Sequence, residues 1–474
     1  MSITFGTDGW RAVIADGFTL ARVRRAARAY GRHLVAAGSG LVLVAHDTRF
    51  GGPMFQQAVA EILRDEGLEV RVATGALPTP VLSFAVRALG AAGGVMLTAS
   101  HNPGTYHGFK IKEAYGGTAT DATYGDVAAH AAALGDEAEP PADRRGFEGF
   151  DARESYFAHL ATLLDLETLR CWRGRVVHDA MHGAAAGWIA AFAAWAGLPC
   201  RVDALRPEPD PMFGGGSPEP MPSTLTGLQG VLEGADPQLS IGVATDGDGD
   251  RLAVVPAGGA PFTAHAVFAL LLDHLDRRGV PGRVVKTVTV SRLVERLALA
   301  RGRGVSETPV GFKYLVEALL AGDVVLAGEE SGGFGVRGHV PERDGILNAL
   351  LMVEALAGSG GGLPERLAAL ETEAGWRHAY DRVDLALGDG AAMARMTAAL
   401  EHDPGDFAGL PVTSVERRDG AKFNVGDDRW VMFRASGTEP VLRVYAEGPD
   451  DGAVRGLLSA AGAFVERALQ PTSR

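Results

Sequence analysis

The sequence predicts an α/β protein with three similar α/β units followed by one smaller α+β unit. The chain has 474 residues, of which 46% are hydrophobic and 22% are charged, a composition typical of globular proteins. At about 150 residues per domain, this length allows roughly three domains. Up to about residue 373, apolar strand-like runs alternate with segments of helical spacing, which is typical of βαβ units. After about Trp376 strand-like runs dominate, which predicts the change to an α+β unit.

The first unit is predicted from three apolar strands and a helix between them. The strands are Leu41–Ala45, Glu69–Thr74 and Gly93–Leu97. The helix is Gln56–Glu66, and the alternation predicts a largely parallel sheet. The acidic, proline-containing stretch Gly135–Gly149 has the composition of a linker and separates this unit from the next.

The second unit contains an uncharged segment, Gly183–Pro199, which raises the question of a membrane span. The segment is rich in Ala and Gly and lies at the short limit for a span. It also follows the strand-like run Arg175–His178, so a buried helix packed on a sheet is favoured. The other predicted elements are a helix over Tyr156–Leu164 and strands over Cys200–Val202 and Leu239–Ala244.

The third unit again alternates strands with helices, and the fourth does not. Elements predicted in the third unit are helices Ala264–Arg278, Arg292–Leu299, Tyr314–Leu320 and Pro364–Thr372 and strands Arg283–Val288 and Asp323–Ala327. Elements predicted in the fourth unit are helix Ala391–Leu400 and strands Arg377–Leu385, Arg429–Arg434 and Val441–Ala446. The first three units share this pattern without a repeat of the residues themselves.

Charge and cysteine content narrow the function classes. The net charge of −13 argues against a general nucleic-acid binder, which needs a basic face, while a small basic site can still bind an anionic substrate. Cys171 and Cys200 are predicted to be unpaired, buried thiols of a reducing compartment. No apolar stretch follows Met1, so we expect no secretory signal, no membrane partner and a cytoplasmic location.

An acidic loop, Asp246–Arg251, follows a predicted strand. Its carboxylates at positions 246, 248 and 250 alternate with glycines, which let the backbone fold tightly so that the carboxylates converge. Oxygen ligands of this kind suit Mg²⁺. An EF-hand loop requires Gly at its sixth position and Glu at its twelfth, where this chain has Arg251 and Ala257, so that interpretation fails. A solvated acidic turn and an aspartyl-phosphate enzyme with Asp246 as the nucleophile remain alternatives.

A serine-containing loop, Thr98–Pro103, also follows an apolar strand. Ser100 would project from a strand-to-loop turn, where a nucleophile is accessible, but a serine needs activation. A phosphate on Ser100 would bring about −1.5 to −2 charge, which a neighbouring Mg²⁺ would neutralise. Lys110 is close enough in sequence for a loop to return it to the same site. A turn with a capping role is the alternative.

Two further loops carry groups that suit a phosphorylated sugar. Glu329 and Ser331, after a strand, can hydrogen-bond several hydroxyls, although a plain turn is equally compatible with these residues. The overlapping G-x-G-x-x-G pattern at 333–338 is followed by His339 and a proline instead of a helix, which excludes dinucleotide binding. Arg434–Pro440, with Arg443 beyond it, offers guanidinium groups, hydroxyls and backbone N–H groups to an anion; a salt-bridged surface turn is the alternative.

Taken together, these segments resemble the α-D-phosphohexomutase superfamily, which includes phosphoglucomutases, phosphomannomutases and phosphoglucosamine mutases. The segments occur in the family's order: Gly6–Arg11, the Ser100 loop, the acidic loop, the Glu329 loop and the Arg434 loop. The resemblance covers nearly the whole chain and implies the four-domain phosphohexomutase architecture, with three similar α/β domains with mixed sheets and a C-terminal α+β domain. The domains expected from it are residues 1–148, 149–255, 256–373 and 374–474.

The resemblance also implies roles for individual residues. Ser100 would be the phosphoserine, and an oxygen of Ser100 would join the Mg²⁺ ligands Asp246, Asp248 and Asp250. Arg251 would lie near the phosphoserine. Lys110 and His101 would be candidates for acid/base chemistry, and Arg11 would balance charge. Residues expected to bind the substrate are Glu329 and Ser331 for the hydroxyls, Arg434, Ser436, Gly437, Thr438 and Arg443 for the phosphate that does not react, and Lys286, Gly311 and Lys313 for sugar discrimination.

Two departures from the family pattern bear on the substrate. His107-Gly108 replaces the Asn-Gly that often stands near the lysine, and Gly332-Gly333 replaces the Gly-His of many phosphomannomutases and phosphoglucosamine mutases. Together with the segment Pro309–Lys313, the second departure favours glucose phosphate. The resemblance therefore implies a mutase for hexose 1- and 6-phosphates with a bisphosphorylated intermediate and glucose 1,6-bisphosphate as activator.

Several alternatives accompany this expectation. Mannose and glucosamine phosphates are alternative substrates of the same mechanism. An aspartyl-phosphate phosphatase or a catalytically inactive sugar-phosphate sensor would leave some of the loops unexplained. The expected partner is a small phosphosugar, with no nucleic acid, and the chain is expected to be a monomer or a homodimer.

Overall fold

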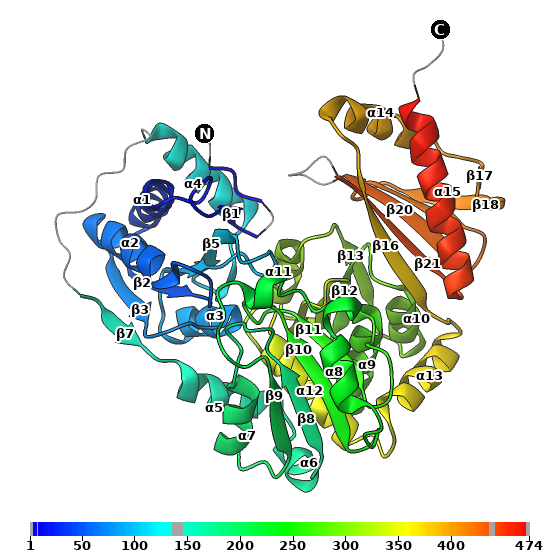
Figure 1. Ribbon diagram of the computed structural model, residues 1–474, viewed down its shortest axis with the longest axis horizontal. Helices are drawn as coiled ribbons and strands as arrows, with labels where there is room; N and C mark the ends of the chain where they lie inside the picture. Colours follow the sequence, from blue (N-terminus) through cyan, green and yellow to red (C-terminus); the bar gives the residue numbers. More distant parts are fainter. Residues whose placement is uncertain (1–2, 7, 135–145, 436–440, 471–474) are drawn as a thin grey trace. The chain divides into compact units, whose positions relative to one another are not determined.

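The computed structural model describes residues 3–6, 8–134, 146–435 and 441–470 (Figure 1). It divides into two compact units. Unit 1 comprises Met1–Gly282 and Gly311–Arg366, and unit 2 comprises Arg283–Val310 and Leu367–Arg474. Helix α13 (Leu363–Ala374) contains the last boundary between them.

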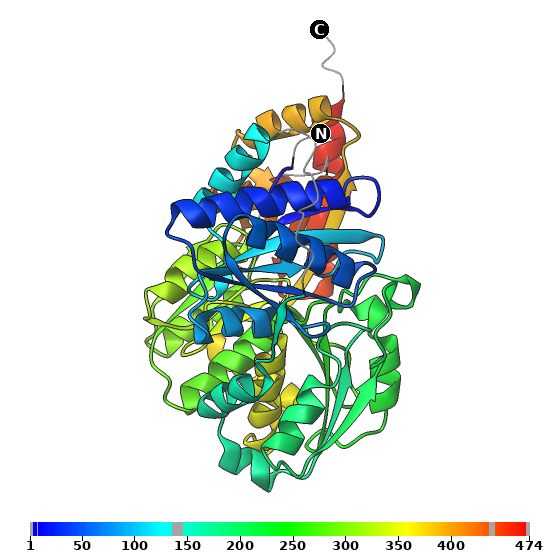
Figure 2. The same cartoon turned by 90° about the vertical axis from the view of Figure 1, so that its left-hand side faces the viewer.

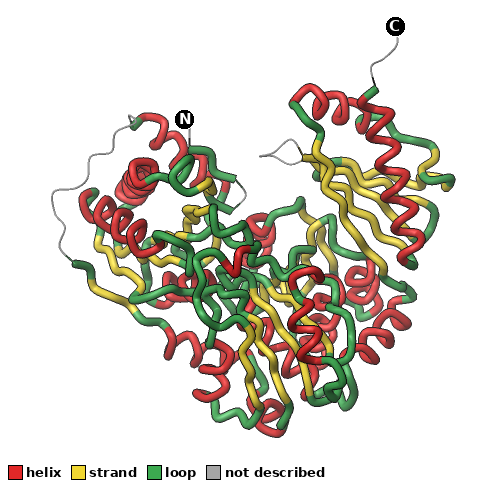
Figure 3. Tube along the Cα trace, in the orientation of Figure 1, coloured by secondary structure: helices red, strands yellow, loops and turns green. Residues whose placement is uncertain are grey.

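Unit 1 is an α/β assembly (Figure 3). Its strands are β1 (Trp10–Val13), β2 (Leu41–His46), β3 (Glu69–Ala73), β4 (Gly93–Leu97), β5 (Tyr106–Glu113), β6 (Gly117–Thr118), β7 (Glu148–Phe150), β8 (Arg175–Asp179), β9 (Arg201–Leu205), β10 (Ser240–Thr245), β11 (Leu252–Pro256), β14 (Val324–Gly328) and β15 (Phe334–Val336). Its α-helices are α1 (Leu20–Ala36), α2 (Gly52–Asp65), α3 (Thr79–Ala88), α4 (Asp121–Ala133), α5 (Arg153–Leu163), α6 (Leu166–Cys171), α7 (Trp188–Trp195), α8 (Thr226–Leu232), α9 (Ala264–Arg277), α11 (Phe312–Leu320) and α12 (Gly345–Ala357).

The sheets of unit 1 are mixed, as expected for this fold class. The first sheet has the order β1-β5-β4-β2-β3-β7, with β6 paired to β5. Strands β2, β3, β4 and β7 run parallel, whereas β5 is antiparallel to β1 and β4. The second sheet has the order β11-β10-β8-β9, with only the β10–β11 pair antiparallel. Strands β14 and β15 form a further antiparallel pair.

Apolar runs and helix caps explain these elements. Strand β2 is a nearly continuous apolar run that is buried on both faces, as expected for a central parallel strand. Helix α1 begins after Thr19, whose side chain accepts a hydrogen bond from the backbone N–H of Arg22; this is a typical N-cap. Helices α1, α2 and α4 pack together beside the first sheet, where α1 is the long dark blue helix of Figure 2.

Unit 2 holds the α+β part of the chain. Its strands are β12 (Arg283–Thr287), β13 (Val305–Thr308), β16 (Ala379–Ala386), β17 (Asp406–Phe407), β18 (Leu410–Glu416), β19 (Ala421–Val425), β20 (Arg429–Ala435) and β21 (Val441–Gly448), and its helices besides α13 are α10 (Arg292–Ala300), α14 (Gly390–Leu400) and α15 (Asp451–Leu469). Strands β12 and β13 are parallel, and the other six form an antiparallel sheet in the order β16-β21-β20-β19-β18-β17. Helices α14 and α15 contact this sheet.

Two predictions from sequence need correction. Cys171 and Cys200 are free thiols, but neither is buried: Cys171 is exposed at the end of α6 and Cys200 is partly exposed. The uncharged segment 183–199 forms a shorter helix than predicted, because Gly183–Gly187 are turns and only α7 is helical. Within the described part of the chain, no helix combines the length and apolar character that a membrane crossing needs.

The fold of unit 1 brings the predicted loops to the carboxyl ends of strands. The Ser100 loop follows β4, the acidic loop follows β10, and the Glu329 loop follows β14. Loops at the carboxyl ends of strands in open α/β sheets are the usual places for ligand sites.

Candidate active site

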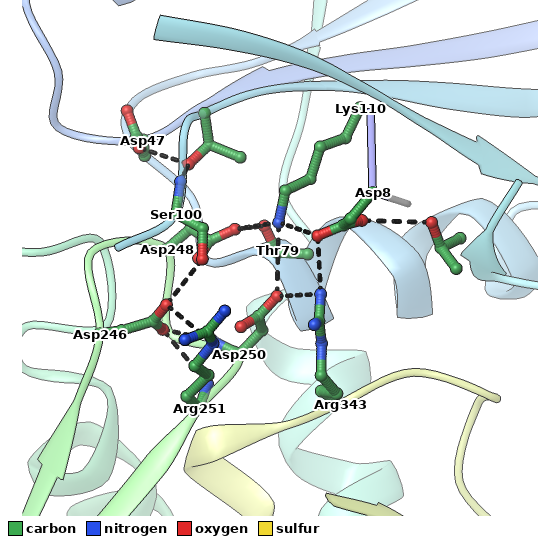
Figure 4. A network of polar contacts seen from close by, with 12 residues as sticks. Asp8, Asp47, Thr79, Ser100, Lys110, Asp246, Asp248, Asp250, Arg251 and Arg343 are labelled. Atoms are coloured by element: carbon green, nitrogen blue, oxygen red, sulfur yellow. Dashed lines mark hydrogen bonds and ion pairs between the residues drawn. The ribbon is translucent and has the colours of Figure 1, made fainter. Parts of the chain in front are cut away.

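Ser100 is held in a strained and buried turn directly after β4. Its backbone has a φ of 52°, a left-handed conformation that costs a non-glycine residue roughly 1 to 2 kcal/mol. Its backbone N–H donates to Thr98 Oγ1 at 2.9 Å. Its hydroxyl donates to Asp246 Oδ2 at 2.8 Å, so the serine side chain points at the acidic loop (Figure 4).

Arg49 fixes the backbone of the serine loop. The guanidinium is fully buried and pairs with Asp47, with Nε 3.0 Å from Oδ2. It also donates to backbone carbonyl oxygens of the loop and the following strand, namely those of Ser100, Asn102, Pro103 and Tyr106. Thr98 Oγ1 donates to the same Asp47 carboxylate at 2.6 Å. One buried ion pair therefore holds the backbone that presents Ser100.

The acidic loop lies in the β10–β11 hairpin and converges as predicted. Asp246, Asp248 and Asp250 are fully buried, and each offers an oxygen within 4.8 Å of the others' oxygens. Asp246 Oδ1 accepts hydrogen bonds from the backbone N–H groups of Asp250 and Arg251. Gly249, at φ 76°, supplies the tight turn, a conformation open to glycine at little cost.

Two oxygens of this loop fit a cation. Asp248 Oδ1 and Asp250 Oδ1 are buried and have no hydrogen-bond partner among the described residues. A buried carboxylate oxygen without a partner is costly, and an Mg²⁺ ion bound through carboxylate oxygens would remove that cost. The donor set of the loop therefore fits the predicted magnesium site.

Lys110, from β5, reaches into the same centre. Its Nζ lies 2.9 Å from Asp248 Oδ2, 3.4 Å from Asp250 Oδ2 and 2.8 Å from Asp8 Oδ2. Burial acts to lower the pKa of Lys110, but the surrounding carboxylates outweigh it and the net shift is upward. Lys110 is therefore an ammonium ion in this arrangement, able to stabilise negative charge.

Two carboxylates of the acidic loop, Asp246 and Asp248, have shifted pKa values. Burial and the negative charges of Asp250 and Asp248 raise the pKa of Asp246 well above its ordinary value. Burial also acts to raise the pKa of Asp248, but the Lys110 ammonium and the hydrogen bond from Thr79 lower it below its ordinary value. The pKa values of these two carboxylates are therefore shifted in opposite directions.

Two arginines complete the positive charge of the site. Arg251 Nε lies 4.0 Å from Asp246 Oδ2, and Arg251 Nη1 lies 3.4 Å from Glu219 Oε1. Arg343 Nη2 lies 2.7 Å from Asp250 Oδ2. Because both guanidinium groups are almost buried, their interactions with the carboxylates are weakly screened by solvent.

The Glu329 loop supplies a carboxylate and a hydroxyl to the site. Burial raises the pKa of Glu329 to about 7, against the opposing effect of Arg343. Ser331 Oγ is buried without a hydrogen-bond partner among the residues that the structure describes. Both groups are available to hydroxyl groups of a ligand.

His101 and Arg11 flank the serine. Burial and nearby cations, Arg251 first among them, hold the pKa of His101 well below its ordinary value, so the imidazole is neutral near pH 7. Its Nδ1 is buried without a partner among the described residues. Arg11 Nη1 donates to Asn102 Oδ1 at 3.0 Å, which places this cation beside the serine loop.

The remaining predicted residues that the structure describes have contacts within their own units. Lys313, in unit 1, pairs with Asp121, and Gly311 precedes α11 at φ 137°. In unit 2, Lys286 pairs with Glu307, Arg434 with Asp419, and Arg443 with Asp384. Arg434 and Arg443 are directly opposite each other on β20 and β21. Ser436, Gly437 and Thr438 lie outside the described residues.

Sequence reasoning did not assign roles to Asp8, Thr79, Arg49 and Arg343. Asp8 lies within the segment Gly6–Arg11, which belongs to the family pattern, but the sequence predicted no role for this residue. Arg343 follows Glu342 and precedes Asp344, and all three are buried. A run of charged residues directly before an apolar helix was the signal that could have indicated it.

Models of one protein family match this chain domain by domain. They are described as phosphoglucomutase/phosphomannomutase alpha/beta/alpha domain I, domain II and domain III and the C-terminal domain, and they match residues 2–137, 154–259, 263–373 and 383–461 respectively.

Individual proteins are similar over the whole length. A phosphoglucosamine mutase of Rhodococcus jostii (strain RHA1) is 33% identical, with 95% of this chain and 96% of the relative covered. A phosphoglucomutase/phosphomannomutase of Thermococcus kodakarensis is 29% identical, covering 99% of this chain and all of the relative. A solved structure from Thermus thermophilus, provisionally described as a phosphomannomutase, is 43% identical with a TM-score of 0.89, covering 98% of this chain and 99% of that chain.

Proposed function

The chain belongs to the phosphoglucomutase/phosphomannomutase family of the α-D-phosphohexomutase superfamily, and we propose that it interconverts glucose 1-phosphate and glucose 6-phosphate through a phosphorylated Ser100. Members of this family are intramolecular phosphotransferases. The observation that carries the assignment of Ser100 is the 2.8 Å hydrogen bond from its hydroxyl to Asp246. A serine held in this way beside a cluster of carboxylates is suited to hold a phosphoryl group next to a divalent cation.

The proposed reaction has two phosphoryl transfers. In the first, the P–O bond to Ser100 Oγ breaks, a P–O bond to the free hydroxyl of hexose 1-phosphate forms, and the hydroxyl proton leaves to a base. The product is a hexose 1,6-bisphosphate, and Ser100 is left as an alkoxide that takes up a proton. In the second transfer the Ser100 hydroxyl gives its proton to a base and its Oγ attacks the phosphorus of the 1-phosphate. The P–O bond to the sugar 1-oxygen breaks and that oxygen takes up a proton, which restores the phosphoserine and releases hexose 6-phosphate.

Residues of unit 1 supply the charge stabilisation that such a transfer needs. Phosphoryl transfer depends mainly on positioning and on neutralising the equatorial oxygens. Lys110, Arg251 and Arg11 are the cations beside Ser100 and the acidic loop. His101 is neutral near pH 7 and is the proposed acceptor of the hydroxyl proton. Lys110 is the other proposed acid/base residue, and because its pKa is raised its main contribution would be positive charge.

We propose that Asp246, Asp248 and Asp250 hold Mg²⁺, together with an oxygen of the phosphorylated Ser100. When bound, the ion would neutralise part of the phosphoryl charge. The unpartnered oxygens of Asp248 and Asp250 support this assignment.

The substrate's other groups are assigned to three further sets of residues. Glu329 and Ser331 are proposed to accept and donate hydrogen bonds to the sugar hydroxyls. The proposed ligands of the phosphate that does not react are Arg434, Ser436, Gly437, Thr438 and Arg443, and those that discriminate between sugars are Lys286, Gly311 and Lys313. Two arginines opposite each other on neighbouring strands suit a dianionic phosphate.

We propose domain boundaries at residues 1–148, 149–255, 256–373 and 374–474, with one of the four predicted loops in each domain. The chain would act as a monomer or a homodimer. Glucose is the proposed preferred sugar because of Gly332-Gly333, while the names of the relatives favour glucosamine and mannose phosphates as competing substrates.

A steady-state comparison tests the substrate. The purified protein is assayed with Mg²⁺ and glucose 1,6-bisphosphate, and kcat/KM is measured for glucose, mannose, glucosamine and ribose 1-phosphates. The highest value for glucose 1-phosphate supports the proposal, and a higher value for another sugar replaces glucose. A phosphoenzyme that is labile to hydroxylamine would instead indicate an aspartyl phosphate.

A further inference from the structure

Arg343 joins three carboxylates that come from different segments of unit 1. Its Nη2 lies 2.7 Å from Asp250 Oδ2 of the acidic loop and 2.8 Å from Asp8 Oδ2 near the amino end. Its Nη1 lies 3.6 Å from Glu329 Oε2 of the sugar loop. Figure 4 shows the guanidinium reaching up from below towards Asp8 and Asp250. The side chain of Arg343 is only 6% exposed, so it forms a buried connection between the acidic loop and the Glu329 loop.

The backbone around Arg343 is fixed against the acidic loop. The backbone N–H of Gly345 donates to the carbonyl oxygen of Gly249 at 3.1 Å. A Cβ at Gly345 would lie 2.6 Å from the carbonyl oxygen of Arg251, so only glycine permits this approach. The guanidinium also lies over the ring of Phe312, with 5.2 Å to the ring centroid. These backbone contacts and the ring of Phe312 therefore fix the position of Arg343.

Position 333 shows that this arginine occupies space which a side chain could otherwise fill. A Cβ built on Gly333 would lie 2.3 Å from Arg343 Cδ and 3.5 Å from Glu329 Oε2. This is the position at which the sequence departs from the Gly-His pattern of many phosphomannomutases and phosphoglucosamine mutases. The missing side chain and the buried arginine are thus two parts of one packing arrangement.

We propose that Arg343 is a positioning residue for sugar recognition. It orients Glu329, favours its ionised form and connects it to the acidic loop through Asp250. The proposal rests on the proposed function, because it takes Glu329 as a ligand of the sugar hydroxyls. A carboxylate accepts hydrogen bonds at both oxygens, whereas a protonated carboxyl group uses one oxygen as a donor.

The charges around Glu329 show why a cation is needed there. Burial raises the pKa of Glu329, and the negative charges of Glu330 and Asp8 act in the same direction. Arg343 is the larger of the two opposing cations, ahead of Arg251. With a pKa of about 7, Glu329 is only partly ionised at neutral pH even beside Arg343. Without the guanidinium its pKa would rise further, and the ionised fraction at neutral pH would fall.

The test compares Arg343→Gln, Arg343→Lys, Glu329→Gln and the double variant Arg343→Gln/Glu329→Gln. We measure kcat and KM for glucose 1-phosphate from pH 6 to 9 at saturating Mg²⁺ and glucose 1,6-bisphosphate. In Arg343→Gln, KM near pH 7 should rise about tenfold, as expected for losing a charge-supported acceptor. The pH above which KM levels off should also move upward by about one unit or more.

Two comparisons separate this role from a structural one. Arg343→Lys keeps the positive charge, so its KM should be much closer to the wild-type value than that of Arg343→Gln. In the Glu329→Gln background, Arg343→Gln should raise KM little further, since residues that act through one another are not additive. A KM that does not change with pH in the variant, or effects of the two changes that simply add, would overturn the proposal.

A second route covers the case in which Arg343→Gln does not fold, as judged by circular dichroism. Gly333→Ala keeps every charge but forces Arg343 to shift, so it should raise KM with the same upward displacement of the pH profile. An unchanged profile in a folded Gly333→Ala protein would contradict the proposal. Wild-type protein that is inactive on all four sugar 1-phosphates would instead overturn the proposed function itself, whereas active wild type with unaffected variants removes only the role of Arg343.

Discussion

The hydroxyl of Ser100 donates a hydrogen bond to Asp246, although the two residues are 146 positions apart in the chain. One lies after β4 of the first sheet and the other after β10 of the second. The fold therefore brings the proposed phosphoryl carrier and the proposed metal ligands together from two different sheets. This arrangement and its supports can be tested one residue at a time.

Replacing Ser100 by alanine should abolish phosphoryl transfer. Ser100→Ala removes the side-chain oxygen that this turn aims at the acidic loop, so mutase activity should fall by several orders of magnitude. Intact-mass measurement after incubation with glucose 1,6-bisphosphate should show one added phosphate on the wild type and none on the variant. Ser155→Ala, on helix α5, is the matched control and should keep both properties. A fully active Ser100→Ala protein would exclude the phosphoserine mechanism.

Magnesium should stabilise the protein through the acidic loop. A ligand at about 100 times its Kd stabilises the folded state by about 2.7 kcal/mol, so thermal unfolding of the wild type should shift upward with added MgCl₂. Asp248→Asn should lose most of this shift, while Asp236→Asn, at an exposed position, should keep it. Scanning calorimetry with and without the ion measures both. An undiminished shift in Asp248→Asn would move the metal to another site.

Removing Arg49 should destabilise the serine loop and the fold. Arg49→Met leaves Asp47 buried without its cation, which typically costs about 3 to 5 kcal/mol. The carbonyl oxygens of the loop lose their donor as well, so kcat should fall in the fraction that still folds. Urea unfolding gives the free energy, and Arg71→Met, which breaks only half-exposed ion pairs, should change it by less than about 1 kcal/mol.

Removing one partner of the buried ion pair Lys112–Glu342 should destabilise the fold more than removing both charges. Both side chains are fully buried, and Ser83 Oγ also donates to Glu342. Lys112→Met alone leaves a buried carboxylate uncompensated, at a cost of about 3 to 5 kcal/mol. The double variant Lys112→Met/Glu342→Gln should be more stable in urea than Lys112→Met, because the unpaired charge is gone. A double variant that is no more stable than Lys112→Met would contradict this account.

Lys422, in unit 2, should make stability depend on alkaline pH. Burial and the nearby Lys286 lower the pKa of Lys422 to about 8, although its Nζ donates to the carbonyl oxygen of Val288 at 2.9 Å. The unfolded lysine titrates near 10.5, so between these pH values the unfolded state binds more protons, and the free energy of unfolding should rise with pH. Urea unfolding at pH 7, 8, 9 and 10 should show this rise in the wild type relative to Lys422→Met. If the difference in the free energy of unfolding between the two proteins did not change with pH, Lys422 would not titrate between pH 7 and 10.

The local placement of the main loops was predictable because each follows an apolar strand. Ser100, Asp246 and Glu329 each follow a run that forms β4, β10 or β14. Alternating glycines and carboxylates predicted the convergence of the acidic loop from backbone geometry alone. The resemblance to the family then supplied the role expected for each loop.

The supports of the site could not be predicted in the same way. Arg49 donates hydrogen bonds to four backbone carbonyl oxygens between residues 100 and 106. Every residue has such a carbonyl, so no residue type in the sequence indicates these contacts. Arg343 lies 335 positions from Asp8, so no spacing rule relates them. Helix α12 was not predicted because its residues are buried all round, which removes the helical periodicity that such a prediction needs. The exposed Cys171 shows that composition alone does not fix burial.

Arg49 holds the left-handed bend at Ser100 in the folded protein, through the carbonyl oxygens of Ser100 and Asn102. The energetic cost of that bend is thus borne by the native state and does not draw on the affinity for a ligand. In the proposed cycle, a sugar that presents first one end and then the other would meet the same fixed oxygen of Ser100 both times. In that cycle the sugar would have to reorient, whereas the oxygen of Ser100 would serve both transfers in one position.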